Sequence, residues 1–291
     1  MAELNADQIE AFRRDGFLVV EEAVDAALLR ALQRDFAAWV EESRAHDAPY
    51  GETINGRPRF DLDPDHSAAR AGLRRVNAPV EISDAYYRAM ADSRMTRLVA
   101  ELIGPDVVFH HSKINSKLPG ARTEVKWHQD FLFTPHSNDD VVTALLMLDA
   151  VTAENGALEV APGSHAGPLH GLWREGRFTG AVDEAVAADA ASRAVACTGP
   201  AGAVCLMHTR LLHGSKPNLS GAARTLFISV YAAADAKPLS PNPMPHKYEG
   251  LLVAGERRNR VRSIPFELEL PELPSTASFF DQQTADAAAA R

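Results

Sequence analysis

The chain has 291 residues, of which 46% are hydrophobic and 24% charged, a composition typical of a globular protein. Its formal net charge of −9 argues against proteins that bind nucleic acid or an anionic membrane surface. No apolar run approaches the roughly 20 residues of a membrane-spanning helix. We therefore expect no nucleic-acid or membrane partner, and the length favours a single domain over residues 1–291.

The first third of the chain, residues 1–105, is predicted to be mainly helical. Asp25 is a plausible N-cap, because the apolar residues that follow it recur three and four positions apart, as on one face of a helix. Gly104 and Pro105 are typical of a helix end. The expected elements are helices over residues 7–14, from Asp25 to about 40 and from about 83 to 103, a strand over 17–20 and a loop over 48–65.

From residue 106 onward, short apolar or alternating runs are separated by turn residues such as Asn155-Gly156 and Pro162-Gly163. Strands at this spacing are typical of antiparallel barrels and sandwiches. The expected strands cover residues 107–117, 123–130, 141–148, 157–161, 203–208 and 225–232. We therefore predict a mainly β fold with flanking helices. Its parts are a double-stranded β-helix (jelly-roll or cupin-like) core over 106–235 packed against the N-terminal helices, a helical insertion at about 166–193 and a C-terminal extension over 236–291.

The two cysteines, Cys197 and Cys205, are too few for a disulfide framework, so free buried thiols are expected. The N-terminal residues contain no basic region followed by an apolar run, so no signal peptide is expected. Both observations favour a cytoplasmic protein. A homodimer is compatible with the sequence, although no feature specifies one.

His128 and Asp130 stand two residues apart, and on a strand such side chains point to the same face. This spacing alone is common by chance. A second histidine from another strand would complete two imidazoles and a carboxylate, the set that suits non-haem Fe(II) and leaves open positions for a co-substrate and O2. His213, at the end of an expected strand, is the candidate for that third ligand.

Arg224 follows His213 by eleven residues, across a turn-rich loop, and begins the next expected strand. On an adjacent antiparallel strand, its side chain would point into the same barrel as His213. A buried arginine needs an anion, and its planar fork matches a carboxylate. The far carboxylate of 2-oxoglutarate is the natural partner if the keto-acid end binds iron. The sequence therefore predicts an enzyme that uses Fe(II), 2-oxoglutarate and O2.

Motifs along most of the chain carry a resemblance to a known family. They are residues 7–12 with 15–19, Trp127-His128-Gln129-Asp130, residues 154–158 leading to Pro162-Gly163-Ser164-His165, and His213-Gly214-Ser215 through Asn218 to Arg224. Together they resemble the phytanoyl-CoA dioxygenase-like branch of the Fe(II)/2-oxoglutarate oxygenases. The resemblance implies that His128, Asp130 and His213 bind iron and that Arg224 anchors 2-oxoglutarate.

The same resemblance implies further roles around the co-substrate. Ser215 corresponds to a hydroxyl that supports the carboxylate bound by Arg224, and Lys113 and Arg75 to basic residues near the co-substrate. Leu145 occupies a position that is aromatic in some relatives. Halogenating relatives replace the metal carboxylate with a small residue. The presence of Asp130 thus implies a hydroxylase, which oxidises an unactivated C–H bond of a small molecule and forms succinate and CO2.

Four residues are predicted to contact substrate. His136 and Asn138 belong to a polar loop directly after the metal-binding motif, where a capped turn is an equally good explanation. Arg210 and Tyr231 are chosen on position alone. The basic run over residues 257–262 is either a solvated loop or a contact for an anionic substrate.

Two other functions stay open. The chain could be a cupin-like metal dioxygenase or hydrolase that does not use 2-oxoglutarate, although such chemistry has no need for Arg224. It could also be a non-catalytic binding module on the same fold, although all the required ligands are present. The substrate is not indicated, and amino acids, phosphonates, osmolytes, acyl compounds and secondary metabolites are all compatible with the sequence.

Overall fold

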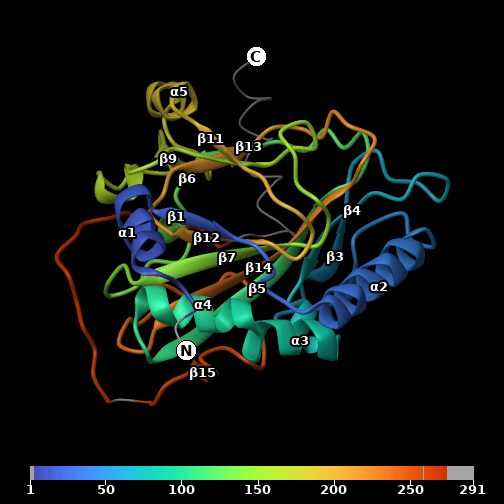
Figure 1. Ribbon diagram of the computed structural model, residues 1–291. Helices are drawn as coiled ribbons and strands as arrows, with labels where there is room; N and C mark the ends of the chain where they lie inside the picture. Colours follow the sequence, from blue (N-terminus) through green and yellow to red (C-terminus); the bar gives the residue numbers. More distant parts are fainter. Residues whose placement is uncertain (1–2, 258, 274–291) are drawn as a thin grey trace.

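Two antiparallel β-sheets form the centre of the protein (Figure 1), in a computed structural model that describes residues 3–257 and 259–273. The larger sheet contains β1 (Phe17–Val20), β2 (Tyr50–Glu52), β3 (Pro58–Leu62), β4 (Leu73–Asn77), β5 (Val107–Lys117), β7 (Val141–Met147), β12 (Val204–His208), β14 (Arg224–Ala233) and β15 (Leu252–Ala254). The smaller sheet contains β6 (Val125–His128), β8 (Leu158–Val160), β11 (Val195–Cys197) and β13 (His213–Ser215).

The strand orders are those of a jelly roll, in which neighbours in space are distant in sequence. The larger sheet runs β1-β12-β7-β14-β5-β4-β3-β2, with β15 added to β5, and the smaller runs β11-β8-β13-β6. Leu226 and Ile228 on β14 belong to an apolar cluster between the two sheets, whereas Phe227 and Tyr231 pack towards the helices. This alternation gives the larger sheet two buried faces. The predicted mainly β fold is thus confirmed.

Helices cover the outer face of the larger sheet (Figure 1). They are α1 (Ala6–Asp15), α2 (Ala26–Ser43), α3 (Asp84–Ala91) and α4 (Arg94–Ile103), while α5 (Glu184–Ser192) lies beyond the smaller sheet. Asp25 caps α2 by accepting a hydrogen bond from the Leu28 amide at 2.7 Å, as expected. Leu28 and Leu32 of α2 pack in the same apolar cluster as Phe227. The helices thus cover one face of the larger sheet. The other face points towards the smaller sheet and is available to line a site.

The structure corrects three sequence predictions about the elements. The expected loop over residues 48–65 contains the hairpin β2–β3, where Tyr50 lies opposite Phe60 and the two rings stack at 4.6 Å. The helix expected over 83–103 is two helices, because Ser93 has an extended backbone between them. The strand expected to end at Asp130 ends at His128, and Asp130 begins a 3-10 turn, η2 (Asp130–Leu132).

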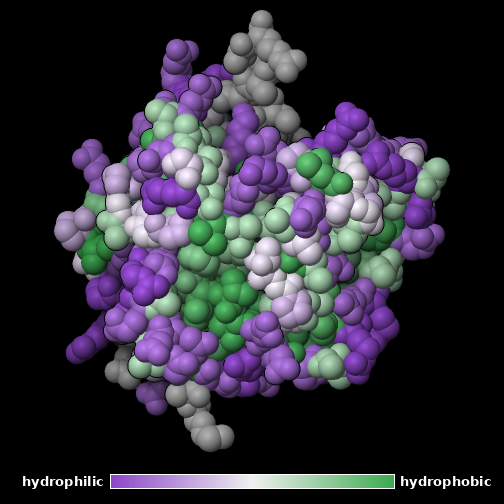
Figure 2. All heavy atoms as spheres, turned by 45° about the horizontal axis from the view of Figure 1, so that its top comes forward, coloured by the Kyte–Doolittle hydropathy of each residue, from purple (hydrophilic) through white to green (hydrophobic). Residues whose placement is uncertain are grey.

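The polarity of the surface and the burial of the two cysteines are as the sequence predicts. Hydrophilic side chains cover most of the face in Figure 2, with a compact hydrophobic area below its centre. Cys197 and Cys205 are free and buried, as expected. Among the described residues, no helix combines the length and the apolar character needed to cross a membrane.

Candidate active site

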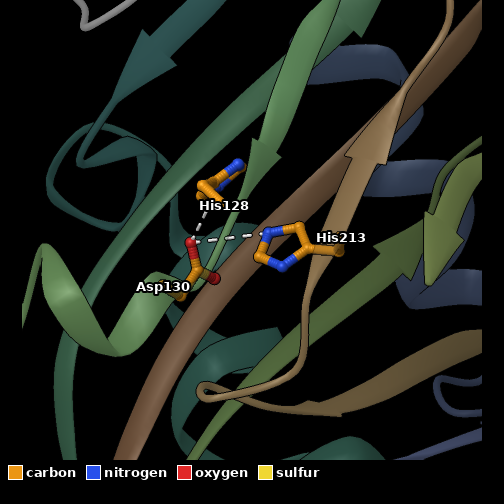
Figure 3. Close-up of side chains that lie close together, drawn as sticks. All are labelled: His128, Asp130 and His213. Carbon is orange, nitrogen blue, oxygen red and sulfur yellow. Dashed lines mark ion pairs between the residues drawn. The ribbon is translucent and has the colours of Figure 1, made fainter. Parts of the chain in front are cut away.

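Three side chains converge where β6 and β13 run side by side. His213 on β13 lies directly opposite His128 on β6, and Asp130 follows two residues later at the start of η2. Asp130 Oδ1 lies 3.5 Å from His128 Nε2 and 3.6 Å from His213 Nε2 (Figure 3). One potential ligand atom from each residue lies within 4.8 Å of the others. The structure therefore brings together the three residues predicted to bind iron.

Hydrogen bonds orient all three side chains for a metal. The Nδ1–H of His128 donates to Lys126 O at 2.7 Å, and that of His213 donates to Leu211 O at 2.9 Å. Since a carbonyl oxygen only accepts, each ring keeps its lone pair on Nε2, the atom that faces Asp130. Burial lowers the pKa of His213 to about 4, so this ring is neutral at pH 7. These donors fit the 2-His-1-carboxylate set of non-haem Fe(II).

Thr143 on β7 holds the carboxylate of this set. Its hydroxyl donates to Asp130 Oδ2 at 2.8 Å, so Oδ1 is left for a metal. The sequence gives no sign of this role for Thr143, because a threonine in an apolar strand belongs to no motif. Phe133 was missed as well, and its ring packs edge-on against His128 at 5.5 Å.

A cavity between the two sheets contains the three ligands and encloses about 570 Å³, including the part open to solvent. Lys113, Ser215 and Arg224, the residues predicted to lie near a co-substrate, line this cavity, and so does Leu145. Burial, followed by the charge of Arg75, lowers the pKa of Lys113 to about 8. Arg75 does not line the cavity but lies on the adjacent strand β4, where its Nε donates to Asn77 Oδ1 at 2.9 Å.

Arg224 offers a buried guanidinium to this cavity. Its Nε donates to Gly156 O at 2.9 Å, and no acceptor among residues 3–257 and 259–273 binds its two terminal nitrogens. The residue is only 3% exposed. Burial lowers the pKa of Arg224 to about 10, which leaves it cationic at pH 7. A buried cation in this state is arranged to receive an anion.

Lys117, at the end of β5, is a further cavity residue that the sequence analysis missed. It lies directly opposite Arg224 in the sheet and donates through Nζ to Ser215 Oγ at 2.7 Å. Alternation along β5 could have identified it, because Lys113 and Lys117 are separated by an even number of residues and share a face. This end of the cavity therefore holds two basic side chains.

The four residues predicted to contact substrate do not line this cavity. The prediction for Tyr231 is wrong, because its hydroxyl donates to Met90 O at 2.9 Å on the helix side of the sheet. His136 is buried and bonds through Nδ1 to Thr134 O at 2.8 Å. Asn138 donates to Arg262 O at 3.1 Å, and Arg210 pairs with Asp139 at 2.8 Å. These contacts hold the loop after the metal ligands in place.

The C-terminal segment packs on that same loop. Arg262 forms ion pairs with Asp140 and Asp235, so this member of the predicted basic run anchors the segment. The Ile264 amide donates to Ser137 O at 2.9 Å, and the Phe266 ring packs against Phe131 at 5.4 Å. Arg258, also part of the basic run, lies outside the described residues.

We predict that Thr143→Val weakens iron binding about tenfold, because the Asp130 carboxylate loses the hydroxyl that orients it. Equilibrium titration of the apoprotein with Fe(II) under anaerobic conditions measures this change. Thr143→Ser keeps the hydroxyl and serves as the matched control. Equal iron affinity in the valine and serine variants would contradict the role of Thr143.

We predict that Tyr231→Phe lowers the free energy of unfolding by about 1 kcal/mol, because Met90 O loses one of its two hydrogen bonds in the core and keeps the one from Thr96 Oγ1. Urea denaturation measures the loss. The KM values for substrate and co-substrate should stay at the wild-type level, since the side chain points away from the cavity. A raised substrate KM in a stably folded variant would restore Tyr231 to the substrate site.

Comparison with known proteins identifies the family. The sequence profile of the family described as Phytanoyl-CoA dioxygenase (PhyH) matches residues 12–226. A probable alpha-ketoglutarate-dependent hypophosphite dioxygenase of Stutzerimonas stutzeri is 37% identical over 206 residues, which cover 68% of this chain and 71% of that protein. An ectoine dioxygenase of Sphingopyxis alaskensis is 30% identical over 258 residues, covering 82% and 79% of the two chains.

A solved structure agrees with these relatives. The crystal structure of EctD from S. alaskensis with 2-oxoglutarate and 5-hydroxyectoine matches with a TM-score of 0.65 and 27% identity. The match covers 92% of this chain and 89% of that one. The fold, the cluster of two histidines and one aspartate, and the sequence relatives thus agree. This chain belongs to the phytanoyl-CoA dioxygenase (PhyH) family and is a non-haem Fe(II)- and 2-oxoglutarate-dependent dioxygenase.

Proposed function

We propose that this dioxygenase hydroxylates a small-molecule metabolite, with Fe(II) bound by His128, Asp130 and His213 and the far carboxylate of 2-oxoglutarate bound by Arg224. The observation that carries the proposal is the Arg224 guanidinium, which is buried in the same cavity as the three metal-binding side chains. 2-Oxoglutarate has a keto acid at one end and a carboxylate at the other, which matches a cavity that holds both the three metal-binding side chains and an arginine. Residues 1–291 act as a single domain in this proposal.

Each group in the cavity has a definite task in this reaction. Bound iron and 2-oxoglutarate supply the oxidising chemistry, in which O2 is consumed and succinate and CO2 are released. Arg224 and Ser215 orient the co-substrate from its far end. Leu145 and Ile228 line the cavity between these groups, and their apolar side chains exclude water from it.

A small anion is the substrate class that the charges of the cavity favour. Among the lining residues, Lys113 and Arg224 are cationic at pH 7, whereas Asp130 is acidic and burial leaves Lys117 mostly neutral. Basic groups in a cavity with apolar walls focus a positive potential, which attracts anions. The relative at 37% identity is named for hypophosphite, which is such an anion, while ectoine dioxygenases match at 24–30%. The oxidised bond is a C–H bond in an organic acid and a P–H bond in a hypophosphite-like substrate.

Release of succinate from 2-oxoglutarate tests this function. Iron-loaded enzyme is incubated with hypophosphite, alkylphosphonates and small carboxylates, and in parallel with ectoine and L-proline. An anion is expected to raise succinate formation well above the substrate-free rate, and Asp130→Ala should abolish it because iron loses a ligand. Stimulation by ectoine or proline alone would rule out the anionic class. Failure of the wild type to consume 2-oxoglutarate with any compound would contradict the reaction itself.

We predict that Arg224→Met raises the KM for 2-oxoglutarate by at least about tenfold, since a charge-assisted bond to the carboxylate is lost. Arg224→Lys keeps the positive charge but lacks the planar guanidinium. Its KM for 2-oxoglutarate should therefore lie between those of Arg224→Met and the wild type. Steady-state kinetics at saturating substrate measure both. An unchanged KM for 2-oxoglutarate in Arg224→Met would contradict the proposed binding of the co-substrate by Arg224.

A further inference from the structure

Lys117 is a buried basic residue to which the reaction described so far gives no task. It is the last residue of β5 and lies directly opposite Arg224, the first residue of β14. The residue is 3% exposed, and it lines the cavity together with Arg224 and Ser215. Like charges opposite one another on neighbouring strands are destabilising. The pair therefore indicates that this end of the cavity is organised around an anion.

The contacts of Lys117 show that it does not bind that anion itself. Its Nζ donates to Ser215 Oγ at 2.7 Å, to Ser215 O at 3.3 Å and to Lys216 O. A lysine ammonium has three hydrogens, and these three acceptors use all of them. Lys117 thus differs from Arg224, whose terminal nitrogens have no acceptor within the described part of the chain.

The bond to Ser215 determines where the serine hydroxyl can point. Oγ accepts the hydrogen bond from Lys117, so its own proton must be directed elsewhere. No other side chain or carbonyl of residues 3–257 and 259–273 accepts that proton. Because Ser215 lines the cavity, the hydroxyl is available to donate to a ligand oxygen beside Arg224.

A glycine turn holds Lys117 and Arg224 in this arrangement. Gly156 has a φ of +82°, and a Cβ there would meet Lys117 Cδ at 3.0 Å and Lys216 O at 2.7 Å. The Gly156 carbonyl accepts from Arg224 Nε at 2.9 Å. From the other side, Asn218 Nδ2 donates to Lys117 O at 2.9 Å. The stem of Lys117 therefore lies close to Gly156, and its backbone carbonyl is held by the loop after β13.

We propose that Lys117 is a positioning residue for the co-substrate, which fixes the Ser215 hydroxyl so that it donates its proton to the carboxylate bound by Arg224. The inference rests on the proposed function, because it requires 2-oxoglutarate in this cavity. Burial, followed by the charge of Arg224, lowers the pKa of Lys117 to about 6. A carboxylate between the two side chains offsets the charge of Arg224 and so favours the ammonium form that makes all three bonds.

The test is a double-mutant cycle on co-substrate binding. Lys117→Met keeps the stem and removes the ammonium, and anaerobic calorimetric titration of the Fe(II)-loaded protein with 2-oxoglutarate should give about tenfold weaker binding. Ser215→Ala should weaken binding to a similar degree. If Lys117 acts through Ser215, Lys117→Met causes no further loss when it is added to Ser215→Ala. In kinetics, the KM for 2-oxoglutarate rises while kcat changes little.

The matched control is Lys216→Met, which removes a neighbouring lysine whose side chain is 71% exposed and paired with Glu159. Its binding of 2-oxoglutarate should equal that of the wild type. Unchanged binding in Lys117→Met, or the same loss with and without Ser215→Ala, would overturn the role of Lys117. Absence of 2-oxoglutarate binding in the wild type would instead contradict the proposed function. If Lys117→Met does not fold, Lys117→Ala, which also removes the donor to Ser215, takes its place in the cycle.

Discussion

The direct pairing of His213 with His128 across β13 and β6 is the contact on which the site depends. It brings the two imidazoles to a centroid distance of 4.1 Å. Each ring donates to the carbonyl two residues earlier, so the local backbone sets Nε2 as the nitrogen that faces Asp130. A slip of one residue would turn either ring to the opposite face of the sheet. The simultaneous pairing of β13 with β8 resists such a slip.

The larger sheet supplies the basic side chains of the cavity. Its strands β5 and β14 carry Lys113, Lys117 and Arg224 into the cavity, whereas the smaller sheet carries the histidines. The two kinds of group meet only because the sheets face each other across an apolar layer, and that layer also keeps the local dielectric low. The helices behind the larger sheet serve the site indirectly, since they bury the face that points away from it.

The site residues that could be predicted from the sequence are those that stand at a recognisable spacing along the chain. His128, Asp130, His213 and Arg224 stand at strand ends beside turn residues, and the structure gathers them into one cavity. Thr143 could not be predicted, because its contact with Asp130 depends on how η2 lies against β7. The spacing of residues along the chain does not indicate that arrangement. The strands β2 and β3 were not predicted, because the glycines and prolines around them are typical of a loop. The stacking of Tyr50 on Phe60 stabilises the hairpin in spite of these turn residues. Tyr231 was misplaced because alternation from Arg224, which points inward, was not followed along β14.

The anchoring of the C-terminal segment connects residues outside the matched span to the surroundings of the metal site. Arg262, Ile264 and Phe266 lie beyond the matched span of 12–226, yet they pack on residues that follow Asp130. The iron ligands thus lie within the matched span, while part of their surroundings comes from a segment outside it. Mutations there can reshape the loop beside Asp130 and leave the metal centre intact. Relatives named for hypophosphite, ectoine and proline show how far substrates diverge within one such lineage.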